Sequence, residues 1–535
     1  MERVNVLICA GTGCSSSNSA LIASKFEEMI IKYGLKDEIK IVKTGCFGLC
    51  QKGPIVAIFP DSVYYSHVKV EDVEEIVSEH LFKGRVVERL ELSDVDVKTK
   101  EKIVDIRKIP FYARQTRIAL KNCGVINPED IYEYIAKDGY RALGEVLEHK
   151  TPQEVIDIVT KSGLRGRGGG GFPTGRKWYF ASIEESDEKY VICNADEGDP
   201  GAFMDRSILE GDPHSVIEAM AIAAYAIGAK YGYIYIRAEY PIAVGRLKIA
   251  IKQAHELGLL GNNILGSGFN FDIEIRLGAG AFVCGEETAL IASIEGKRGN
   301  PVPKPPFPAK SGVWGKPTII NNVETFANIP QIILKGAEWF ASIGTEKSKG
   351  TKVFALGGKI TNTGLVEIPM GTTLRQVIYD IGGGCPDGKR FKAVQTGGPS
   401  GGCLTEKDLD VPIDYDNLIE KGSMMGSGGM IVLDEDNCMV DVARFYLDFI
   451  VDESCGKCTP CRVGTKRLLE MLTKICKGEG TLELLDEMEE LCYHIKNNSL
   501  CGLGQSAANP VLSTLKNFRE EYIAHIVDKR CPAHV

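Results

Sequence analysis

The chain has 535 residues and a net charge of −9, with 44% hydrophobic and 25% charged residues. This length predicts three to five domains, because single hydrophobic cores stop growing at about 300 residues. The absence of a long basic run excludes a nucleic-acid surface, and no apolar run approaches the ~20 residues of a membrane span. The first residues lack the apolar region of a secretory signal. We therefore expect a cytoplasmic protein without nucleic-acid or membrane partners.

The chain contains 17 cysteines. Structural disulfides do not persist in the cytoplasm, so this many cysteines favour the binding of metal ions or clusters, provided that their spacing is suitable.

Residues 1–83 are predicted to form a small α/β domain with strands at 4–9, 39–44, 55–59 and 63–65 and helices at 19–33 and 70–82. Two cysteine pairs, C-x4-C and C-x3-C, follow its first two strands. Turns at neighbouring strand ends can converge on one point, as a four-thiolate iron–sulfur site requires. Thioredoxin-type redox chemistry and zinc ribbons both prefer C-x2-C, which neither pair shows. The predicted cluster ligands are Cys9, Cys14, Cys46 and Cys50.

After a charge-rich linker at 84–110, five glycines fall within residues 166–171. Such a loop can bring bare N–H groups against a bound anion. Pro173 suits the first turn of a following helix, whose N-terminus favours a phosphate. The G-x-G-x-x-G spacing matches the Rossmann fingerprint, but that fingerprint needs a preceding strand and this loop follows a predicted helix at 151–161. The sequence predicts a nucleotide-binding loop of another kind.

Two later segments complete the pattern. Residues 191–200 read as a buried strand that ends in several acidic and amide side chains, and residues 278–289 form a second glycine-rich turn leading into a helix. Together with the stretch TIINNVET at 318–325, these motifs resemble the flavin- and NADH-binding subunit of respiratory complex I. Diaphorase-type subunits of soluble hydrogenases and formate dehydrogenases contain the same module. The resemblance covers about residues 112–501 and rests on separate motifs in the same order.

The resemblance implies the residues that approach the cofactors. For FMN they are Gly166, Gly168, Lys177, Asn194, Asp196, Glu197, Phe282, Gly285, Glu286, Glu287, Ile320, Asn321, Asn322 and Thr325. For the nicotinamide cofactor they are Phe172, Lys177, Phe180, Asp199, Glu287 and Phe307. Phe282 stands where the family often has tyrosine. Taken singly, each of these could be an ordinary helix, core or turn residue; the ordered set favours the functional interpretation.

The implied fold is a multidomain α/β and α+β chain. A thioredoxin-like [2Fe–2S] domain (1–83) precedes an FMN- and NADH-binding α/β domain (111–345). A ubiquitin-like β-grasp (SLBB) domain (346–440) and a C-terminal helical bundle (441–535) follow. In the bundle, C-x2-C-x2-C and one distant cysteine form a [4Fe–4S] arrangement; zinc would also accept four thiolates, but three such close ligands suit a cubane better. These ligands are Cys455, Cys458, Cys461 and Cys501.

Several C-terminal cysteines and histidines remain after these assignments. A further zinc site on Cys476, His525 and Cys531 is one interpretation, with Cys492 and His534 as neighbours in the sequence. Buried structural cysteines with surface histidines are the alternative. Cys123, Cys193, Cys284, Cys385, Cys403 and Cys438 are read as packing or turn residues.

The predicted function is that of an NADH:acceptor oxidoreductase subunit, in which a flavin converts two-electron into one-electron transfer. The fused N-terminal domain resembles the β subunits of multimeric iron-only hydrogenases. This implies a separate thioredoxin-like [2Fe–2S] subunit and a catalytic iron–sulfur hydrogenase subunit as partners, with ferredoxin-coupled electron bifurcation. Alternatives are a formate dehydrogenase diaphorase subunit and a scaffold with a vestigial flavin site. NAD is expected over NADP, because Asp199 and Glu287 would repel a 2′-phosphate.

Overall fold

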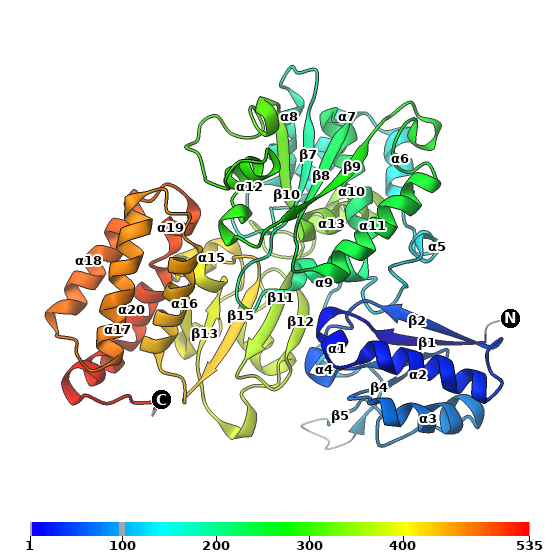
Figure 1. The fold of residues 1–535 in the computed structure, drawn as a ribbon, viewed down its shortest axis with the longest axis horizontal. Coiled ribbons are helices and arrows are strands. Elements are labelled where there is room, and N and C mark those ends of the chain that lie inside the picture. The colour runs from blue at the N-terminus through cyan, green and yellow to red at the C-terminus, as the bar shows by residue number, and fades with distance from the viewer. Residues whose placement is uncertain (1–2, 96–101, 534–535) are drawn as a thin grey trace.

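The computed structural model describes residues 3–95 and 102–533 (Figure 1). In the N-terminal domain, β1 (Val4–Cys9) pairs in parallel with β2 (Ile39–Thr44) and antiparallel with β3 (Val56–Phe59), and β4 (Val63–Tyr65) completes the sheet in the order β2-β1-β3-β4. α2 (Ser19–Lys32) and the helical stretch made of Val70–Asp72, α3 (Val73–Glu75) and Ile76–Phe82 supply its helices. The strands and helices predicted for this region are therefore present.

The predicted linker contains some regular structure. β5 (Asp94–Val95) pairs antiparallel with β6 (Lys102–Ile103), and the short helix α4 (Pro110–Ala113) follows.

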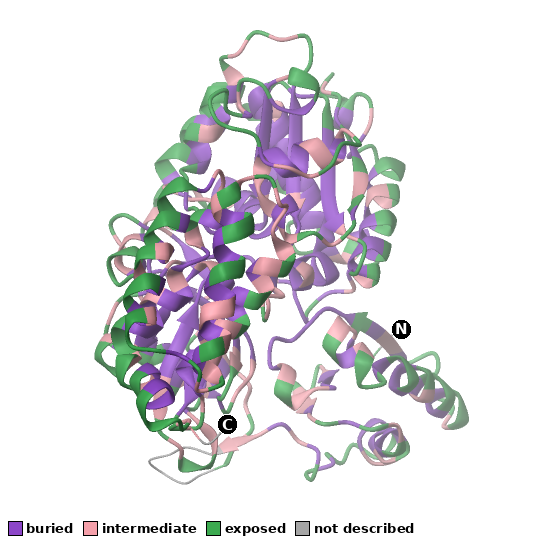
Figure 2. Ribbon diagram, turned by 60° about the vertical axis from the view of Figure 1, so that its left-hand side comes forward, coloured by how far each residue is buried: buried purple, intermediate pink, exposed green. Residues whose placement is uncertain are grey.

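The central domain is built on a four-stranded parallel sheet in the order β10-β7-β8-β9. Its strands are β7 (Tyr190–Ala195), β8 (Tyr231–Arg237), β9 (Asp272–Gly278) and β10 (Thr318–Asn322). β7 and β8 are largely buried (Figure 2) and read as nearly continuous apolar runs, whereas the edge strand β9 alternates apolar and polar residues. Helices surround it: α5 (Ile131–Ile135), α6 (Arg141–His149), α7 (Pro152–Ser162), α8 (Thr174–Ser182), α9 (Met204–Gly211), α10 (Pro213–Ile227), α11 (Pro241–Glu256), α12 (Glu287–Ile294), α13 (Val323–Lys335) and α14 (Ala337–Ala341).

The third domain is a five-stranded mixed sheet in the order β12-β11-β15-β13-β14. Its elements are β11 (Thr351–Gly358), β12 (Gly364–Pro369), the helical segment Gln376–Ile381, β13 (Phe391–Thr396), β14 (Cys403–Thr405), α15 (Tyr415–Glu420) and β15 (Gly429–Asp434). Apolar side chains of this sheet, such as Phe354 and Val366, share one hydrophobic core with Leu7 and Phe47 of the N-terminal domain. The first and third domains are therefore packed together.

The C-terminal domain is helical, as predicted. It contains α16 (Met439–Glu453), a helical turn Pro460–Thr465 that continues into α17 (Lys466–Cys476), then α18 (Glu483–Asn498), α19 (Gly502–Ser506) and α20 (Asn509–Ile523). Leu468, Leu472 and Ile475 recur at helical spacing on α17 and are buried in the bundle core. Among the described residues, no helix has both the length and the apolar character that crossing a membrane requires.

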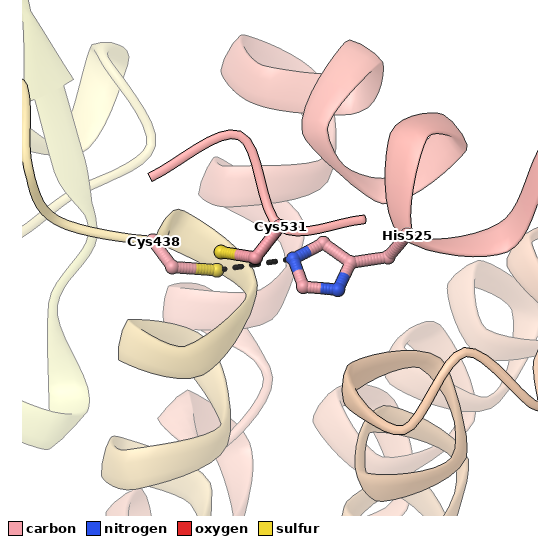
Figure 3. Close-up of side chains that lie close together, drawn as sticks. All are labelled: Cys438, His525 and Cys531. Carbon is pink, nitrogen blue, oxygen red and sulfur yellow. Dashed lines mark hydrogen bonds between the residues drawn. The ribbon is translucent and has the colours of Figure 1, made fainter. Parts of the chain in front are cut away.

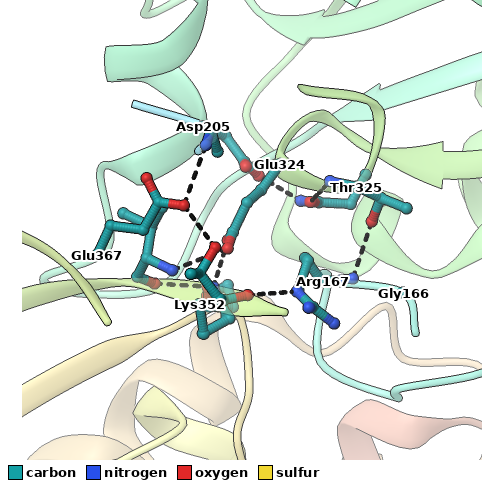
Figure 4. A network of polar contacts seen from close by, with 12 residues as sticks. Gly166, Arg167, Asp205, Glu324, Thr325, Lys352 and Glu367 are labelled. Atoms are coloured by element: carbon teal, nitrogen blue, oxygen red, sulfur yellow. Dashed lines mark hydrogen bonds and ion pairs between the residues drawn. The ribbon is translucent and has the colours of Figure 1, made fainter. Parts of the chain in front are cut away.

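A buried polar network joins the central sheet to the β-grasp sheet (Figure 4). Lys352 on β11 forms an ion pair with Glu324 on α13, and both side chains are almost fully buried. Glu324 also accepts a hydrogen bond from the Val353 N–H at 2.8 Å. Burying such charges costs free energy unless they are paired and hydrogen-bonded, so the network fixes how these two domains meet.

Candidate flavin, nicotinamide and iron–sulfur sites

The candidate flavin site lies where two parallel strands end side by side. Asn194 at the end of β7 pairs in register with Asn322 at the end of β10. The Asn194 side chain donates to the carbonyl oxygen of Gly285 at 2.9 Å, which ties the second glycine turn to this edge. In open parallel sheets, ligands bind outside the carboxyl ends of the strands, so the fold brings these predicted residues to a suitable place.

The first glycine-rich loop runs directly over this edge. It begins after α7, which ends at Gly163 with a positive φ of 68°. A Cβ at Gly168 would lie 3.1 Å from the Asn322 Cβ, so a side chain there would press on the strand end. The Arg167 N–H donates to Thr325 Oγ1 at 2.8 Å. The loop is therefore held close to the polar ends of the sheet.

Arg167 supports the loop from within the protein. Its guanidinium is fully buried and donates to the carbonyl oxygens of Thr351 at 2.9 Å, Lys349 at 2.7 Å and Arg165 at 2.8 Å. All these donors bond to backbone carbonyl groups, so this arginine stabilises the conformation of the loop rather than binding a phosphate. Nothing in the sequence pattern distinguishes it from an anion-binding arginine.

Charged side chains from α8 and α12 meet beside the loop. Lys177 Nζ donates to the Ile320 carbonyl oxygen at 2.9 Å and lies 3.7 Å from Glu287 Oε2. Burial lowers the pKa of Lys177. Glu286 caps α12 by accepting from the Thr288 and Ala289 N–H groups. Lys304 contacts both Glu286 and Glu287, at 3.1 and 2.8 Å. The charged groups beside the loop are thus paired with one another.

Asp196 is the clearest indication that this site binds a polar ligand. Both of its carboxylate oxygens are buried, and neither has a hydrogen-bond partner within the described part of the chain. Burial raises its pKa to about 7. Its neighbour Glu197 accepts from the Asp205 and Arg206 N–H groups at 3.0 and 3.1 Å, and burial raises its pKa to about 7 as well. A buried acid without partners needs an explanation, and a polyhydroxylated cofactor such as FMN supplies suitable donors.

A cleft of about 580 Å³ opens beside Lys177 and Glu287. Ile320 and Thr318 of β10 form part of its wall, and Arg176 and Lys310 also line it. Five of the six predicted nicotinamide residues line the cleft: Phe172, Lys177, Phe180, Glu287 and Phe307.

Asp199 is the sixth predicted residue and does not line this cleft. It accepts a hydrogen bond from Ser427 and would touch a Cβ placed at Gly398, at 3.2 Å. The turn after β7 directs Asp199 toward the β-grasp domain, which the sequence alone does not indicate.

The four predicted [4Fe–4S] cysteines line one small cavity, which Val283 and Pro301 also border. The second glycine-rich turn, residues 278–289, is called the flavin loop below, and it contacts this domain. The Phe282 N–H donates to Glu453 Oε2 at 2.9 Å, and the Phe282 ring packs edge-on against Phe449 with centroids 5.3 Å apart. Phe282 is therefore a contact between the flavin loop and the cluster domain.

The four N-terminal cysteines also converge. Cys46 Sγ and Cys50 Sγ lie 3.7 Å apart, and the Gly48 N–H donates to Cys46 Sγ at 3.2 Å. Contact with the thiols of Cys14 and Cys46 raises the pKa of Cys9 well above its ordinary value. Four crowded thiols with an N–H donor to sulfur fit a [2Fe–2S] cluster.

A third group of candidate metal ligands lies near the C-terminus (Figure 3). Cys438, His525 and Cys531 place their ligand atoms within 4.8 Å of one another, and Cys438 Sγ lies 3.3 Å from His525 Nε2. Cys438, which is buried in the hydrophobic core as expected of a packing residue, also belongs to this candidate group, whereas Cys476 does not. Cys438 precedes α16 and is distant in sequence, so spacing could not reveal it; His534 lies outside the described residues.

Comparisons with known protein families agree with this architecture. Residues 1–81 match the thioredoxin-like [2Fe-2S] ferredoxin family, and residues 159–331 match the Nuo51 FMN-binding domain. Residues 353–404 match the SLBB domain, and residues 441–525 match the NADH-ubiquinone oxidoreductase-F iron-sulfur binding region.

Individual relatives extend the match over most of the chain. The NADP-reducing hydrogenase subunit HndC of Solidesulfovibrio fructosivorans is 67% identical over 422 residues, covering 79% of this chain and 86% of the relative. A NADH-quinone oxidoreductase subunit of Rhizobium meliloti is 48% identical over 417 residues, which is 78% of this chain and 99% of the relative. A chain in the crystal structure of a NAD+-reducing [NiFe]-hydrogenase in the H2-reduced state aligns with a TM-score of 0.69 at 28% identity, covering 98% of this chain and 84% of that one.

Proposed function

Since this chain belongs to the family of FMN- and iron–sulfur-binding subunits typified by the complex I 51-kDa subunit, we propose that it is the NADH:acceptor oxidoreductase (diaphorase) subunit of a hydrogenase complex. FMN, when bound, supplies the conversion between the two-electron chemistry of a nicotinamide and the one-electron chemistry of iron–sulfur clusters. The observation that carries the proposal is the position of the cleft. It shares Lys177 and Glu287 with the predicted flavin site, and the loop before α12 borders the cavity of the four C-terminal cysteines.

The chain's own residues would bind and orient the two cofactors. The N–H groups of the glycine loop and the N-terminus of α8 suit the FMN phosphate. The buried carboxyl group of Asp196 would exchange hydrogen bonds with the flavin's hydroxyl groups, while Lys177 lies between the Ile320 carbonyl and Glu287. The exposed rings of Phe172 and Phe307 provide apolar surface for a planar ring and exclude water when covered.

The hydrogenase assignment is supported by the relative with 67% identity, which is named as a hydrogenase subunit. We further propose the partners expected above: a thioredoxin-like [2Fe–2S] subunit, a catalytic iron–sulfur hydrogenase subunit and ferredoxin, with electron bifurcation among them. Clusters at both ends of the chain supply two separate exits for single electrons, which bifurcation requires.

The test is to purify the native complex and the single chain. The chain loaded with FMN and clusters should reduce viologen dyes with NADH and should neither form nor consume hydrogen. Lys177→Met should lower kcat/KM for NADH at least tenfold, whereas Lys161→Met, an exposed lysine at the end of α7, should have no effect. Hydrogen turnover by the single chain, or recovery of a formate-oxidising subunit in its native complex, would contradict the proposal.

Only one of the two carboxylates expected to select NADH over NADPH lines the cleft. Glu287 lines the cleft and favours NADH, whereas Asp199 does not line it, and Arg176 and Lys310 add positive charge there. We keep NADH as the proposed substrate, because Glu287 is a carboxylate of the cleft wall that can accept from a ribose hydroxyl. Measured kcat/KM values for the two cofactors decide the matter: a preference for NADPH that Arg176→Ala or Lys310→Ala abolishes would refute our choice.

We also propose that Cys438, His525 and Cys531 bind a zinc ion, with its remaining position filled by water or by a group outside the described residues. Two thiolates and an imidazole are ligands that zinc prefers. Chain purified without chelators should contain zinc, and both Cys438→Ser and His525→Ala should lose it while retaining both clusters. Cys476→Ser is the matched control and should retain the zinc. Absence of zinc from the wild-type chain would refute this proposal.

A further inference from the structure

The cluster-binding loops of the N-terminal domain lie directly on helix α9 of the flavin domain. A Cβ at Gly45, the residue before the cluster cysteine Cys46, would lie 2.4 Å from the Gly211 Cα at the end of α9. Two glycines facing each other allow the two backbones to touch. The neighbouring Thr44 side chain donates to the Ile126 carbonyl at 2.7 Å in the same buried boundary.

Glu210 of α9 reaches into the loop between the first two cluster cysteines. Its carboxylate accepts from the Thr12 N–H at 2.9 Å and from the Thr12 hydroxyl. Glu210 Oε2 and Cys46 Cβ both lie within 3.4 Å of the position that a Cβ at Gly11 would take. Glu210 is only 1% exposed. A carboxylate from a residue 198 positions away is thus buried beside the predicted cluster.

The opposite end of the same helix belongs to the flavin site. The N–H groups of Asp205 and Arg206, at the start of α9, donate to the carboxylate of Glu197. Arg206 also lies 4.0 Å from Glu210, one turn further along. The eight residues of α9 span about 12 Å. One rigid helix therefore connects a carboxylate of the flavin site to a carboxylate at the N-terminal cysteines.

The β-grasp domain closes the other side of the same cysteine loops. The Leu365 N–H donates to the Gly48 carbonyl at 2.7 Å, and the Gln51 N–H donates to the Thr363 carbonyl at 3.2 Å. Three of the four cysteines are buried as a result. Three domains thus exclude water from this centre, and a fixed charge acts more strongly where water is excluded.

We propose that Glu210 is a positioning residue for the N-terminal [2Fe–2S] centre. It holds the residue 11–14 loop on α9, and its negative charge lowers the reduction potential of the cluster, because an added electron is less favourable beside a buried carboxylate. This inference rests on the proposed cluster ligands Cys9, Cys14, Cys46 and Cys50. It assigns a function to a residue of the flavin domain that lies outside every predicted motif.

The experiment is a redox titration of the full chain, followed by the paramagnetic signals of its two reduced clusters. Glu210→Gln removes the charge but keeps a hydrogen-bond acceptor, and we expect the potential of the [2Fe–2S] cluster to rise. Glu210→Asp restores the charge and should return the potential toward the wild-type value. Glu133→Gln is the matched control: Glu133 forms an ion pair with Lys40 across the same domain boundary and should leave the potential unchanged. The [4Fe–4S] potential serves as an internal reference and should not move.

The outcomes separate this inference from the ligand assignment. If the wild-type chain shows no [2Fe–2S] signal, the assignment of the four cysteines is wrong and the inference falls with it. If the signal is present but Glu210→Gln and wild type have the same potential, the ligands stand and the role of Glu210 is refuted. If Glu210→Gln loses the cluster, Glu210→Asp decides: a retained cluster with the wild-type potential supports the inference, and an equal loss refutes it.

Discussion

The two predicted cluster sites hold four thiolates each but are built in different ways. The N-terminal cysteines lie between three domains, and Cys9, Cys14 and Cys46 are buried. The C-terminal cysteines come from one helical domain, and all of them except Cys461 remain partly exposed. The first site is therefore enclosed by three domains, whereas the second is held by one helical domain and bordered by Val283 and Pro301 of the flavin domain. Two sites with the same four thiolate ligands can thus have different surroundings, one formed by domain packing and the other mainly by a single domain.

Iron content should distinguish the two cluster sites most strongly. Wild-type chain should contain about six irons, and Cys46→Ser should lower this to about four, whereas Cys458→Ser should lower it to about two. Cys403→Ser, a buried cysteine bonded to Gln395, is the control and should keep the wild-type content. Metal analysis of anaerobically purified protein provides the measurement. A wild-type value near four irons would contradict the N-terminal assignment.

The next perturbation acts on the framework that both sites share. Lys352→Met leaves Glu324 charged and buried without its partner, so the free energy of unfolding should fall by about 3–5 kcal/mol. Because the network lies between the central and β-grasp domains, both clusters should be lost at lower temperature together. Denaturant unfolding and cluster absorbance are the measurements, with the exposed Lys359→Met as control. Loss of one cluster alone would show that the two sites do not share this framework.

A third prediction concerns the flavin pocket between the two sites. Burial raises the pKa of Asp196 to about 7, so the folded chain binds its proton more tightly than the unfolded chain does. The resulting stability is present at low pH and is lost as pH rises from about 4 to about 7, by at most roughly 1.4 kcal/mol per unit. Asp196→Asn should therefore stabilise flavin-free protein at pH 8 and weaken FMN binding.

Thermal unfolding of flavin-free protein between pH 5 and pH 8 tests this, with the exposed Asp187→Asn as control. If Asp196→Asn and the wild type change in parallel across this range, Asp196 is not the titrating group.

A weaker perturbation concerns the contact between the flavin loop and the C-terminal domain. Phe449→Leu removes the aromatic contact with Phe282, which is worth about 0.5–1.5 kcal/mol beyond its buried area. The [4Fe–4S] cluster should become slightly easier to remove with a chelator, while the [2Fe–2S] cluster should not change. Phe445→Leu, an exposed residue of the same helix, is the control. Equal changes at both clusters would show that the contact does not act locally.

Much of this organisation could be predicted from the sequence, because local spacing carries it. Apolar patterns predict the strands β1, β2 and β4 with the bounds that the structure shows. The cysteine spacings bring each set of four thiols together, and five of the six expected nicotinamide residues line one cleft. In these cases the chemistry is encoded in short segments whose order identifies the family.

Contacts between segments that are far apart in the chain required the tertiary structure. Four such contacts have no periodic pattern in the sequence that would predict them. They are the grouping of Cys438 with His525, the hydrogen bonds of Arg167 to the backbone, the direction of Asp199 and the contact of Glu210 with Thr12. Each depends on how whole domains pack, and packing is decided by the sum of many buried surfaces rather than by any local pattern. Short motifs therefore specify the cofactor chemistry and the domain order, whereas domain packing selects the distant charges that surround each centre.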